Sequence, residues 1–474
     1  MDGIRGARRV HVVGSGPNGL AAAIALAGAG RRVVVHEAEP TLGGGARSAA
    51  LTRPGFVHDV CSAVHPFAAG SPFFRTLPLA AHGLAWVDPP APCAHPLDDG
   101  SAAVCERRLD ATAAGLGADG ARWARLMAPF VRAWDALAAD VLAPPLHRPR
   151  HPLLLARFAL AARRPAATLA RVAFRDAPAR ALFAGMAAHG VLPLDAVPTS
   201  AFALLLAATA HAVGWPVPRG GAQRLADALV GVLGARGGEL RVNDRIESVD
   251  VLPQDATVLL DVTPRQAERV AGHRFPERYR RLLRRWRYGP GAFKVDWALD
   301  APVPWRAAAC ARAGTVHLGG TLAEIAAAER DVAEGREPER PFVLFAQPTR
   351  FDATRTPAGR HVAWAYCHVP HGSTRDMTAC IEAQVERFAP GFTRRVLARC
   401  ASGPADLERH DANLVGGDFS GGSHRLVQLL ARPRLLRPYA TPDPRVFLCS
   451  AATPPGGGVH GMCGWHAAQA VLRT

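Results

Sequence analysis

Residues 10–37 read VHVVGSGPNGLAAAIALAGAGRRVVVHE, and this stretch decides the fold. The residues before the first glycine are mostly apolar and predict a short buried strand, Val10 to Val13. An Ala- and Leu-rich helix is expected from about Leu20 to Ala29, and a second buried strand from Val33 to His36. Strand, glycine-rich turn, helix and strand in this order predict a βαβ unit of a parallel sheet.

The glycines of this stretch have the spacing GxGxxG, which is typical of dinucleotide-binding turns. Gly14 allows the tight turn, Gly16 lets the backbone approach a pyrophosphate, and Gly19 lets the helix pack closely on the strand. The helix N-terminus then presents its partial positive charge to the phosphates. Glu37 ends the second strand, where an acidic residue is expected to bind the adenosine ribose.

Two further glycine clusters follow the same logic. The first is Gly43-Gly44-Gly45, which we expect to bring backbone amides, and with them Arg47, to the same pyrophosphate. The second lies near the C-terminus, where an apolar strand at 446–449 precedes the sequence PPGGGVHG at 454–461 and a helix from about Cys463. The C-terminal segment is therefore another junction of strand, glycine loop and helix like the one at Gly14 to Gly19.

The middle of the chain has a different pattern. Residues 80–215 are rich in Ala and Leu, are interrupted by Pro, and favour helices. Residues 220–249 return to an α/β pattern, with a helix at 223–235 and a strand at 240–249. Alternating stretches within residues 293–370 predict an antiparallel sheet. We expect an α/β fold, in which a doubly wound domain carries an inserted domain of antiparallel sheet plus helices.

The composition limits the classes of partner. The chain has 474 residues, 49% of them hydrophobic, and a formal net charge of +16. Such a charge suits nucleic acid, an anionic membrane or an acidic ligand. No nucleic-acid recognition module is present and the arginines are scattered, so nucleic acid is not expected as a partner. Lys294 is the only lysine, and the positive charge therefore reflects a bias toward arginine.

The nine cysteines form no CxxC pair and no zinc-like spacing, which predicts free thiols in a reducing compartment. His58, Asp59, Cys61 and His65 lie close in sequence, but their spacing is irregular and no metal site is expected. The apolar run near the N-terminus is broken by glycines, unlike the core of a signal peptide, and no stretch reaches membrane-spanning length. We expect a soluble, cytoplasmic protein.

These glycine motifs resemble those of FAD-dependent oxidoreductases of the phytoene desaturase-like and flavin amine oxidase superfamily. Within it, the chain is similar to bacterial relatives of the mitochondrial pyridine nucleotide-disulfide oxidoreductase domain-containing protein 2. The similar motifs are HAVGWP at 211–216 running into Gly220-Gly221, TVHLG at 315–319 and GGD at 416–418. The resemblance implies a bound FAD, with the adenosine near Glu37 and the flavin near the C-terminal glycine loop.

The resemblance also implies which residues contact FAD. In the family, the backbone around Ile246 meets the adenine. Many relatives carry an arginine where this chain has Gly45, and Arg47 is the expected substitute at the pyrophosphate. The residues predicted to bind FAD are Gly14, Gly16, Pro17, Asn18, Gly19, Glu37, Gly43, Gly44, Gly45, Arg47, Ile246, Gly457, Gly458, Val459 and Met462.

A glutathione reductase-like FAD domain in this superfamily is built from separate segments of the chain. We expect residues 1–80, 219–288 and 416–474 to form it. Residues 81–218 are expected to form a helical cap of the substrate domain, and residues 289–415 its antiparallel sheet.

A pyridine nucleotide-disulfide reductase needs a second dinucleotide motif and a redox-active cysteine pair close in sequence, and the chain has neither. The flavin is therefore expected to pass its electrons to oxygen or a quinone. The expected function is the dehydrogenation (desaturation) of a hydrophobic organic substrate by hydride transfer to flavin N5. Two alternatives stay open: C–N oxidation as in flavin amine oxidases, and a non-redox isomerase or scaffold role with FAD bound.

Three residues are candidates for catalysis. Lys294 can hold a water or change protonation where an arginine cannot. Alternatively, it is an exposed strand residue that remained a lysine by chance. Some flavin amine oxidases place a lysine at the flavin N5 through water. His65 is a base or a structural, hydrogen-bonded group, and His460 either stabilises the reduced flavin or caps its loop. Trp215 and Trp297 either wall an apolar substrate cavity or belong to the core.

Residues 147–180 contain eight arginines and one acidic residue, Asp176, with Leu, Val and Phe interleaved. This composition is typical of amphipathic helices that contact an anionic membrane surface. An ordinary helical cap with arginines on its wet face has the same composition. Both interpretations stay open.

Overall fold

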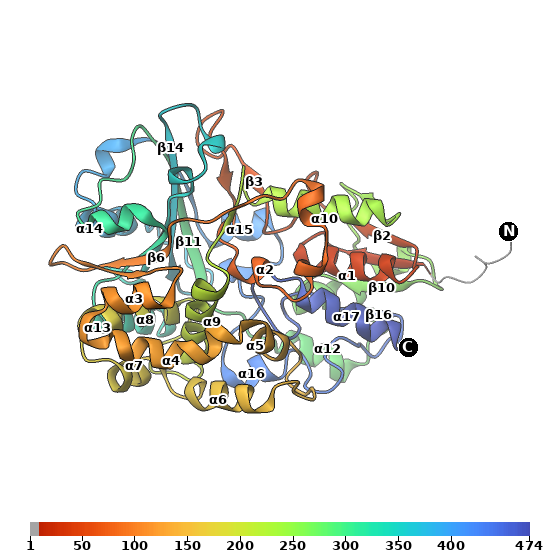
Figure 1. Ribbon diagram of the computed structural model, residues 1–474. Helices are drawn as coiled ribbons and strands as arrows, with labels where there is room; N and C mark the ends of the chain where they lie inside the picture. The colour runs from red at the N-terminus through yellow and green to blue at the C-terminus, as the bar shows by residue number, and fades with distance from the viewer. Residues whose placement is uncertain (1–8) are drawn as a thin grey trace.

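The structure, a computed structural model, describes residues 9–474 and contains two large sheets (Figure 1). The first sheet has five parallel strands in the order β16-β10-β1-β2-β9. In that order the strands are β16 (Val446–Leu448), β10 (Thr257–Leu260), β1 (Val10–Val13), β2 (Val33–His36) and β9 (Glu239–Arg241). Strands from both ends of the chain and from its middle therefore meet in one sheet.

Helices cover both faces of this sheet, and every residue of β1, β2 and β16 is accordingly buried. On one face α1 (Pro17–Gly28) packs against α10 (Gln223–Ala235) and α17 (Met462–Leu472). On the other face lie α11 (Pro264–Ala271) and α12 (Glu277–Arg284), whose apolar residues share a core with the strands. A Cβ on Gly464 would lie 1.8 Å from the Asn18 carbonyl oxygen. The first and last helices can approach this closely only because a glycine stands there.

The second sheet has seven strands in the order β15-β11-β14-β13-β12-β6-β7, of which only β6 and β12 pair in parallel. Its strands are β15 (Val396–Ser402), β11 (Gly291–Leu299), β14 (His361–Val369), β13 (Val343–Ala346), β12 (Ala313–Leu318), β6 (Ala91–Pro96) and β7 (Ala102–Cys105). The helix α14 (Thr378–Phe388) packs on one of its faces.

A group of helices occupies the lower left of Figure 1, next to this sheet. They are α3 (Leu109–Gly115), α4 (Gly120–Arg132), α5 (Trp134–Val141), α6 (Pro152–Ala162), α7 (Ala166–Ala173), α8 (Ala177–Ala188), α9 (Thr199–Ala212) and α13 (Leu322–Ala333). The helix α9 is the centre of this group and touches α4 to α8. The shorter helices are α2 (Pro66–Ala69), α15 (Pro404–His410) and α16 (Leu426–Leu430). Within residues 9–474, none of the helices is both long and apolar enough to cross a membrane.

The two faces of β11 carry different residues, because side chains alternate along a strand. One face packs against the core next to α14 through Phe293, Val295 and Trp297. The other face carries Lys294 and Asp296, which lie directly opposite Tyr366 and Trp364 of β14.

The fold class predicted from the sequence is confirmed, and so are most of the elements. The strands at 10–13 and 33–36 and the helix at 223–235 have their predicted bounds. The predicted strand 240–249 is wrong beyond Arg241, because Asn243 adopts a left-handed φ of +53° and the chain leaves the sheet. The first helix begins at Pro17, a residue that suits the first turn of a helix. The division into five domain segments stays a prediction.

Candidate functional site

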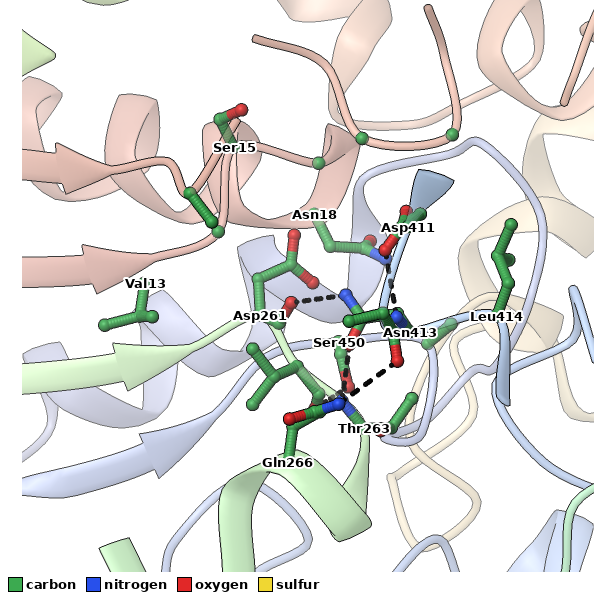
Figure 2. Close-up of a pocket in the computed structure, with 18 of the residues that line it drawn as sticks. Val13, Ser15, Asn18, Asp261, Thr263, Gln266, Asp411, Asn413, Leu414 and Ser450 are labelled. Atoms are coloured by element: carbon green, nitrogen blue, oxygen red, sulfur yellow. Dashed lines mark hydrogen bonds between the residues drawn. The ribbon is translucent and has the colours of Figure 1, made fainter. Parts of the chain in front are cut away.

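A pocket lies at the carboxyl edge of the five-stranded sheet, where doubly wound folds bind their ligands. Residues that follow four of the strands line it: Gly14 after β1, Glu37 after β2, Asp261 after β10 and Ser450 after β16. Figure 2 shows the part of the pocket around Asp261, with Ser15 and Asn18 on one side and Ser450 on the other. The parallel sheet thus brings residues distant in sequence to one edge.

The N-terminus of α1 faces this pocket. Gly14 has a φ of +102°, a conformation that favours glycine. A Cβ on Gly16 would lie 2.8 Å from Asp261 Oδ2, and one on Gly19 would lie 2.2 Å from the Gly14 carbonyl oxygen. The N-cap residue of α1 is Gly16, which has no side chain to offer, and no acidic residue stands in the first turn of the helix. One N–H of the first turn, that of Gly19, donates to Asp261. The helix N-terminus still presents its partial positive charge to the pocket, and this glycine cradle fits the pyrophosphate of FAD.

Asp261 is a pocket residue that the sequence did not reveal. Its Oδ2 accepts a hydrogen bond from the Gly19 N–H at 2.7 Å. Burial, and next the carboxylates of Asp411 and Glu37, raise the pKa of Asp261 to about 8. The carboxyl group is therefore mainly protonated at neutral pH, and it does not repel a phosphate. The only signal in the sequence is an acidic residue directly after an apolar strand.

Glu37 joins the two glycine clusters of the N-terminal segment. Its Oε2 accepts hydrogen bonds from the Ser15 N–H at 3.1 Å and the Ser15 hydroxyl at 2.5 Å. Ser15 Oγ in turn accepts a hydrogen bond from the Gly43 N–H at 3.0 Å. Glu37 lines the pocket at the end of β2, the position in which an acid was predicted to meet a ribose.

Arg47 lines the pocket and is 6% exposed. Its Nε donates to the Gly44 carbonyl oxygen at 2.8 Å, and its Nη2 donates to the His410 carbonyl oxygen at 2.7 Å. The guanidinium therefore ties the glycine cluster at residues 43–45 to the C-terminal end of α15. A contact between Arg47 and the pyrophosphate stays a prediction.

The segment after α15 forms a wall of the pocket that the sequence also did not reveal. Asn413 Nδ2 donates to the Asp261 carbonyl oxygen at 3.1 Å, and Asn413 Oδ1 accepts from the Thr263 N–H at 2.9 Å (Figure 2). Asp411 lies close by, and burial raises its pKa. No motif marks this loop, because its place depends on strands and helices far away in sequence.

Most of the residues predicted to bind FAD line the pocket. These are Gly14, Gly16, Pro17, Asn18, Glu37, Gly44, Gly45, Arg47, Ile246, Gly458 and Val459. Four others lie behind the lining. Gly19 faces Asp261, Gly43 faces the Ala226 methyl group, Gly457 packs against Ser420, and Met462 starts α17.

The two candidate histidines lie outside the lining of the pocket, and each has a structural contact. His460 Nδ1 accepts a hydrogen bond from the Met462 N–H at 3.0 Å, and His65 Nε2 lies 3.1 Å from Ser62 Oγ. Burial lowers the pKa of both side chains to about 4. Both are therefore neutral at neutral pH. This arrangement favours the capping role for His460 and the hydrogen-bonded structural role for His65.

Lys294 is 3% exposed, so the alternative of an exposed strand position is wrong. Its Nζ binds Asp296, a carboxylate with no exposed surface, and lies 5.5 Å from the centre of the Trp364 ring. Asp296 Oδ1 also lies 3.4 Å from His58 Nδ1. Burial, Arg47 and Lys294 together lower the pKa of His410, a residue of the pocket lining, to about 4. Tyr366, directly opposite Lys294 in the sheet, has its ring 5.5 Å from that of Phe419, which lines the pocket. The sheet face that carries Lys294 therefore adjoins the pocket.

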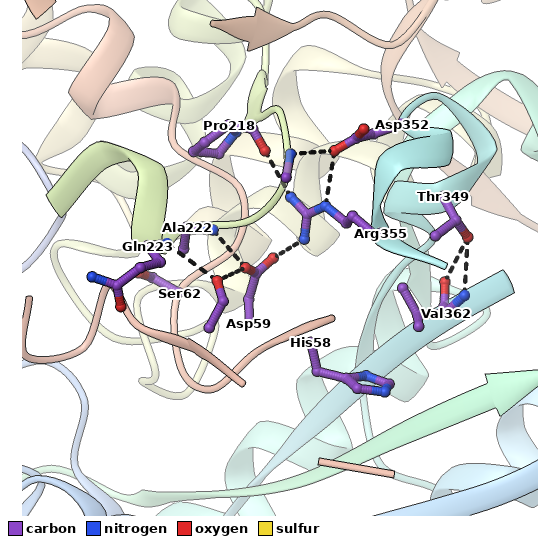
Figure 3. Close-up of polar contacts among 12 residues, drawn as sticks. His58, Asp59, Ser62, Pro218, Ala222, Gln223, Thr349, Asp352, Arg355 and Val362 are labelled. Atoms are coloured by element: carbon purple, nitrogen blue, oxygen red, sulfur yellow. Dashed lines mark hydrogen bonds and ion pairs between the residues drawn. The ribbon is translucent and has the colours of Figure 1, made fainter. Parts of the chain in front are cut away.

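A second buried ion pair joins three segments of the chain that are distant in sequence and lie outside the pocket lining (Figure 3). Arg355 has no exposed surface and binds Asp59, Asp352 at 3.1 Å and the Pro218 carbonyl oxygen at 2.9 Å. Asp59 also accepts a hydrogen bond from the Ala222 N–H at 2.6 Å. Burial alone would raise the pKa of Asp59, but Arg355 and the hydrogen bonds hold it below its usual value. Asp59 is thus a structural residue, and residues 9–474 contain no cluster suited to a metal ion.

Trp215 and Trp297, for which the sequence left a cavity wall and the core as alternatives, are both buried. Trp297 packs against Phe345 and Phe392 in the core beside α14, on the face of β11 away from Lys294. The cavity-wall interpretation is therefore wrong for Trp297. Trp215 is buried and donates from Nε1 to the Leu206 carbonyl oxygen at 3.2 Å.

The structure also pairs two cysteines that are separated in sequence. Cys93 and Cys105 lie directly opposite each other in β6 and β7, and both are buried free thiols. His211 Nε2 lies 3.8 Å from Cys105 Sγ. Neither thiol lines the dinucleotide pocket, so this pair does not supply a disulfide reductase site next to the cofactor.

Known proteins agree with this architecture. Residues 12–77 match the family model of an NAD(P)-binding Rossmann-like domain. The mouse pyridine nucleotide-disulfide oxidoreductase domain-containing protein 2 is 27% identical over 344 residues, which cover 63% of this chain and 59% of the mouse protein. The chain thus spans less than two thirds of that relative. The predicted similarity to this group is confirmed.

Solved structures share the fold over nearly the whole chain. An oxidoreductase from Methanosarcina mazei superposes with a TM-score of 0.65 at 16% identity, covering 98% of this chain and 100% of that one. A putrescine oxidase bound to putrescine superposes with a TM-score of 0.63 at 18% identity, covering 98% and 99%. The chain has the fold of FAD-dependent oxidoreductases, and the match and the pocket support FAD as the cofactor, as predicted.

Proposed function

We propose that this protein is an FAD-dependent oxidoreductase that dehydrogenates a hydrophobic organic substrate. One observation carries the proposal: the dinucleotide pocket runs from Glu37, past the N-terminus of α1, to Gly458 and Val459. Its wall at Phe419 lies against Tyr366, which stands directly opposite Lys294 in the seven-stranded sheet. A pocket for a dinucleotide therefore lies next to a sheet face that carries one ionised pair among aromatic side chains.

The residues present fit FAD along the pocket. Glu37 would hold the adenosine ribose, the α1 N-terminus the pyrophosphate, and the loop at Gly458 the flavin end. When bound, FAD supplies a hydride acceptor at flavin N5. Because Asp261 is mainly protonated at neutral pH, the pocket places little additional negative charge beside the phosphates.

The substrate side would be the face of the seven-stranded sheet that carries Lys294. Trp364 and Tyr366 stand on that face with their rings 5.9 Å apart and nearly parallel. Their faces are apolar and suit a hydrocarbon chain or ring. Lys294 Nζ donates to Asp296, and its remaining N–H groups can orient a water or a polar group of the substrate. The electron acceptor we propose is oxygen or a quinone.

Oxidation of a C–N bond is the second candidate. The stacked pair of Trp364 and Tyr366 favours it, because aromatic faces attract ammonium groups, and Trp364 already lies 5.5 Å from the Lys294 ammonium. The putrescine oxidase that shares the fold is known with its amine bound. A non-redox role with bound FAD is the third alternative.

Anaerobic reduction of the bound flavin distinguishes these functions. The holoprotein is mixed without oxygen with hydrophobic alkenes and alkanes, and separately with primary amines of similar size, while the oxidised-flavin absorption is followed. Bleaching by the hydrocarbons with formation of a new C=C bond supports desaturation. Bleaching by amines with release of ammonia after reoxidation supports the second candidate. A flavin that no compound reduces, although dithionite reduces it, contradicts both.

A further inference from the structure

The exposed apolar side chains of this protein are concentrated in two short stretches. Nine of the fourteen large ones among the described residues lie within 146–172 and 426–436. They are Leu146, Leu153, Leu160 and Val172 in the first stretch, and Leu426, Val427, Leu430, Leu435 and Leu436 in the second. Leu153 is 87% exposed and Val427 is 82% exposed. Side chains this apolar and this exposed are normally scattered singly over a surface.

The exposed leucines of α6 are not on the face that this helix packs against the core. Leu153, Arg157 and Leu160 follow the spacing of one helix face, and all three are exposed. Phe158, on another face, is buried and packs edge-on against Phe130. The helix therefore buries one face in the protein, and a second face, with two leucines and an arginine, is exposed to solvent.

The second stretch is fixed to the same part of the molecule. His424, just before α16, lies 3.0 Å from the Gly190 carbonyl oxygen through Nδ1, and its ring lies 4.8 Å from that of Phe202 in α9. The same helix α9 packs against α6. Figure 1 shows α6 and α16 on one edge of the molecule. Buried Arg432 anchors the stretch, because it donates to the carbonyl oxygens of Ala451 at 2.8 Å and Gly422 at 3.0 Å.

The charges of these two stretches differ from those elsewhere. Residues 146–172 and 425–437 contain no Asp or Glu. Their exposed basic residues are Arg148, Arg150, Arg157, Arg163, Arg164, Arg171, Arg425 and Arg437. None of these arginines forms an ion pair in the described part of the chain, whereas arginines such as Arg274, Arg284 and Arg387 each meet two carboxylates. This surface therefore offers cations with free hydrogen-bond donors beside exposed leucines.

We propose that residues 146–172 and 425–437, the α6–α16 surface, bind an anionic lipid bilayer. The leucines and valines enter the boundary between headgroups and acyl chains, and the arginines bind the lipid phosphates. A second copy of the chain would bring like charges together on this surface. Nucleic acid would engage the arginines but leave the leucines in water. The proposal concerns association alone and does not depend on the proposed reaction.

Sedimentation of the full-length holoprotein with vesicles tests the proposal. One set of vesicles is phosphatidylcholine alone, and the other is phosphatidylcholine mixed equally with phosphatidylglycerol. We expect binding to the anionic vesicles at low salt, little binding to the neutral ones, and release as salt is raised. Retained FAD and an unchanged circular dichroism spectrum establish that each variant is folded.

Single variants separate the contribution of the apolar side chains to vesicle binding from that of the arginines. Leu153→Ser and Val427→Ser each weaken binding by about tenfold, since each removes a side chain that leaves water. Arg157→Gln weakens it by roughly fivefold, as expected for one cation near an anionic surface. The matched controls are Val251→Ser, at a residue 70% exposed outside the surface, and Arg360→Gln, at an exposed arginine elsewhere. Both controls bind as the parent protein does.

Three results would each overturn the proposal. The first is an absence of binding to anionic vesicles at low salt. The second is equal loss of binding in the Leu153→Ser variant and the Val251→Ser control. The third is a dimer, or a complex with an oligonucleotide, that Val427→Ser abolishes while vesicle binding stays unchanged.

Discussion

The edge of the five-stranded sheet and the face of the seven-stranded sheet are the two sides of the proposed site, and they are built differently. At the edge, the groups that bind are mostly backbone atoms of residues that directly follow strands, such as Gly16. On the face, they are alternate side chains of long strands, such as Lys294 and Trp364. Binding at the edge of the five-stranded sheet therefore requires glycines, which leave the backbone accessible. Binding at the face of the seven-stranded sheet requires particular side chains and the contacts between them.

The largest expected effect concerns the face. Lys294→Met leaves Asp296 buried without its cation and lowers the free energy of unfolding by about 3–5 kcal/mol. The double variant Lys294→Met/Asp296→Asn recovers most of that loss, because no uncompensated charge is left. Denaturant unfolding of the single and double variants measures both values. If the two variants are equally unstable, the pair is not what stabilises this face.

Adding a methyl group at Gly19 tests the close packing at the edge of the five-stranded sheet. Gly19→Ala places a Cβ against the Gly14 carbonyl oxygen and Asp261, which costs about 1–3 kcal/mol of stability and weakens FAD binding. Gly234→Ala is the matched control, because a Cβ there meets nothing within 4 Å on a helix. The control is expected to be as stable as the parent protein or more stable. Thermal unfolding and fluorescence titration of FAD compare the two, and equal behaviour would contradict the close packing of the edge.

The third test uses pH to put a charge on the edge. The pKa of Asp261 is raised to about 8, so the carboxyl group ionises as pH rises above that value and then opposes the pyrophosphate. Between pH 7 and pH 9 the dissociation constant of FAD is expected to rise about tenfold. Asp261→Asn cannot ionise and should show a flat profile. Parallel profiles for the parent and the variant would exclude Asp261 as the titrating group.

The smallest effect is expected at Arg47. Arg47→Ala removes the hydrogen bonds to the Gly44 and His410 carbonyl oxygens and weakens FAD binding by roughly fivefold. Arg47→Lys keeps the charge but not the two-point geometry. If only the alanine variant loses affinity, charge at the pyrophosphate is the main contribution. If both lose it, the role of Arg47 is to position the loop.

The same contrast explains how much the sequence could predict. The edge was largely predictable, because GxGxxG and its flanking strands form a local pattern with a known geometry. Asp261 and Asn413 were not, since their place beside the α1 N-terminus exists only after β10 and the segment following α15 reach it. On the face, Lys294 was singled out by composition alone. The alternation in β11 was visible, but the sequence did not indicate which set of side chains meets the pocket, and it therefore left both interpretations of Trp297 open.

The contact of α1 with α17 has a consequence for how this protein is made. The strand β1 at residues 10–13 needs β10 as a neighbour, β10 needs β16 at 446–448, and α1 rests on α17 through Gly464. During translation, the glycine-rich turn leaves the ribosome long before these partners exist. The cofactor site is therefore completed only when residue 472 has been synthesised, and until then the nascent chain exposes the apolar surfaces that these helices cover, which makes it a client for chaperones.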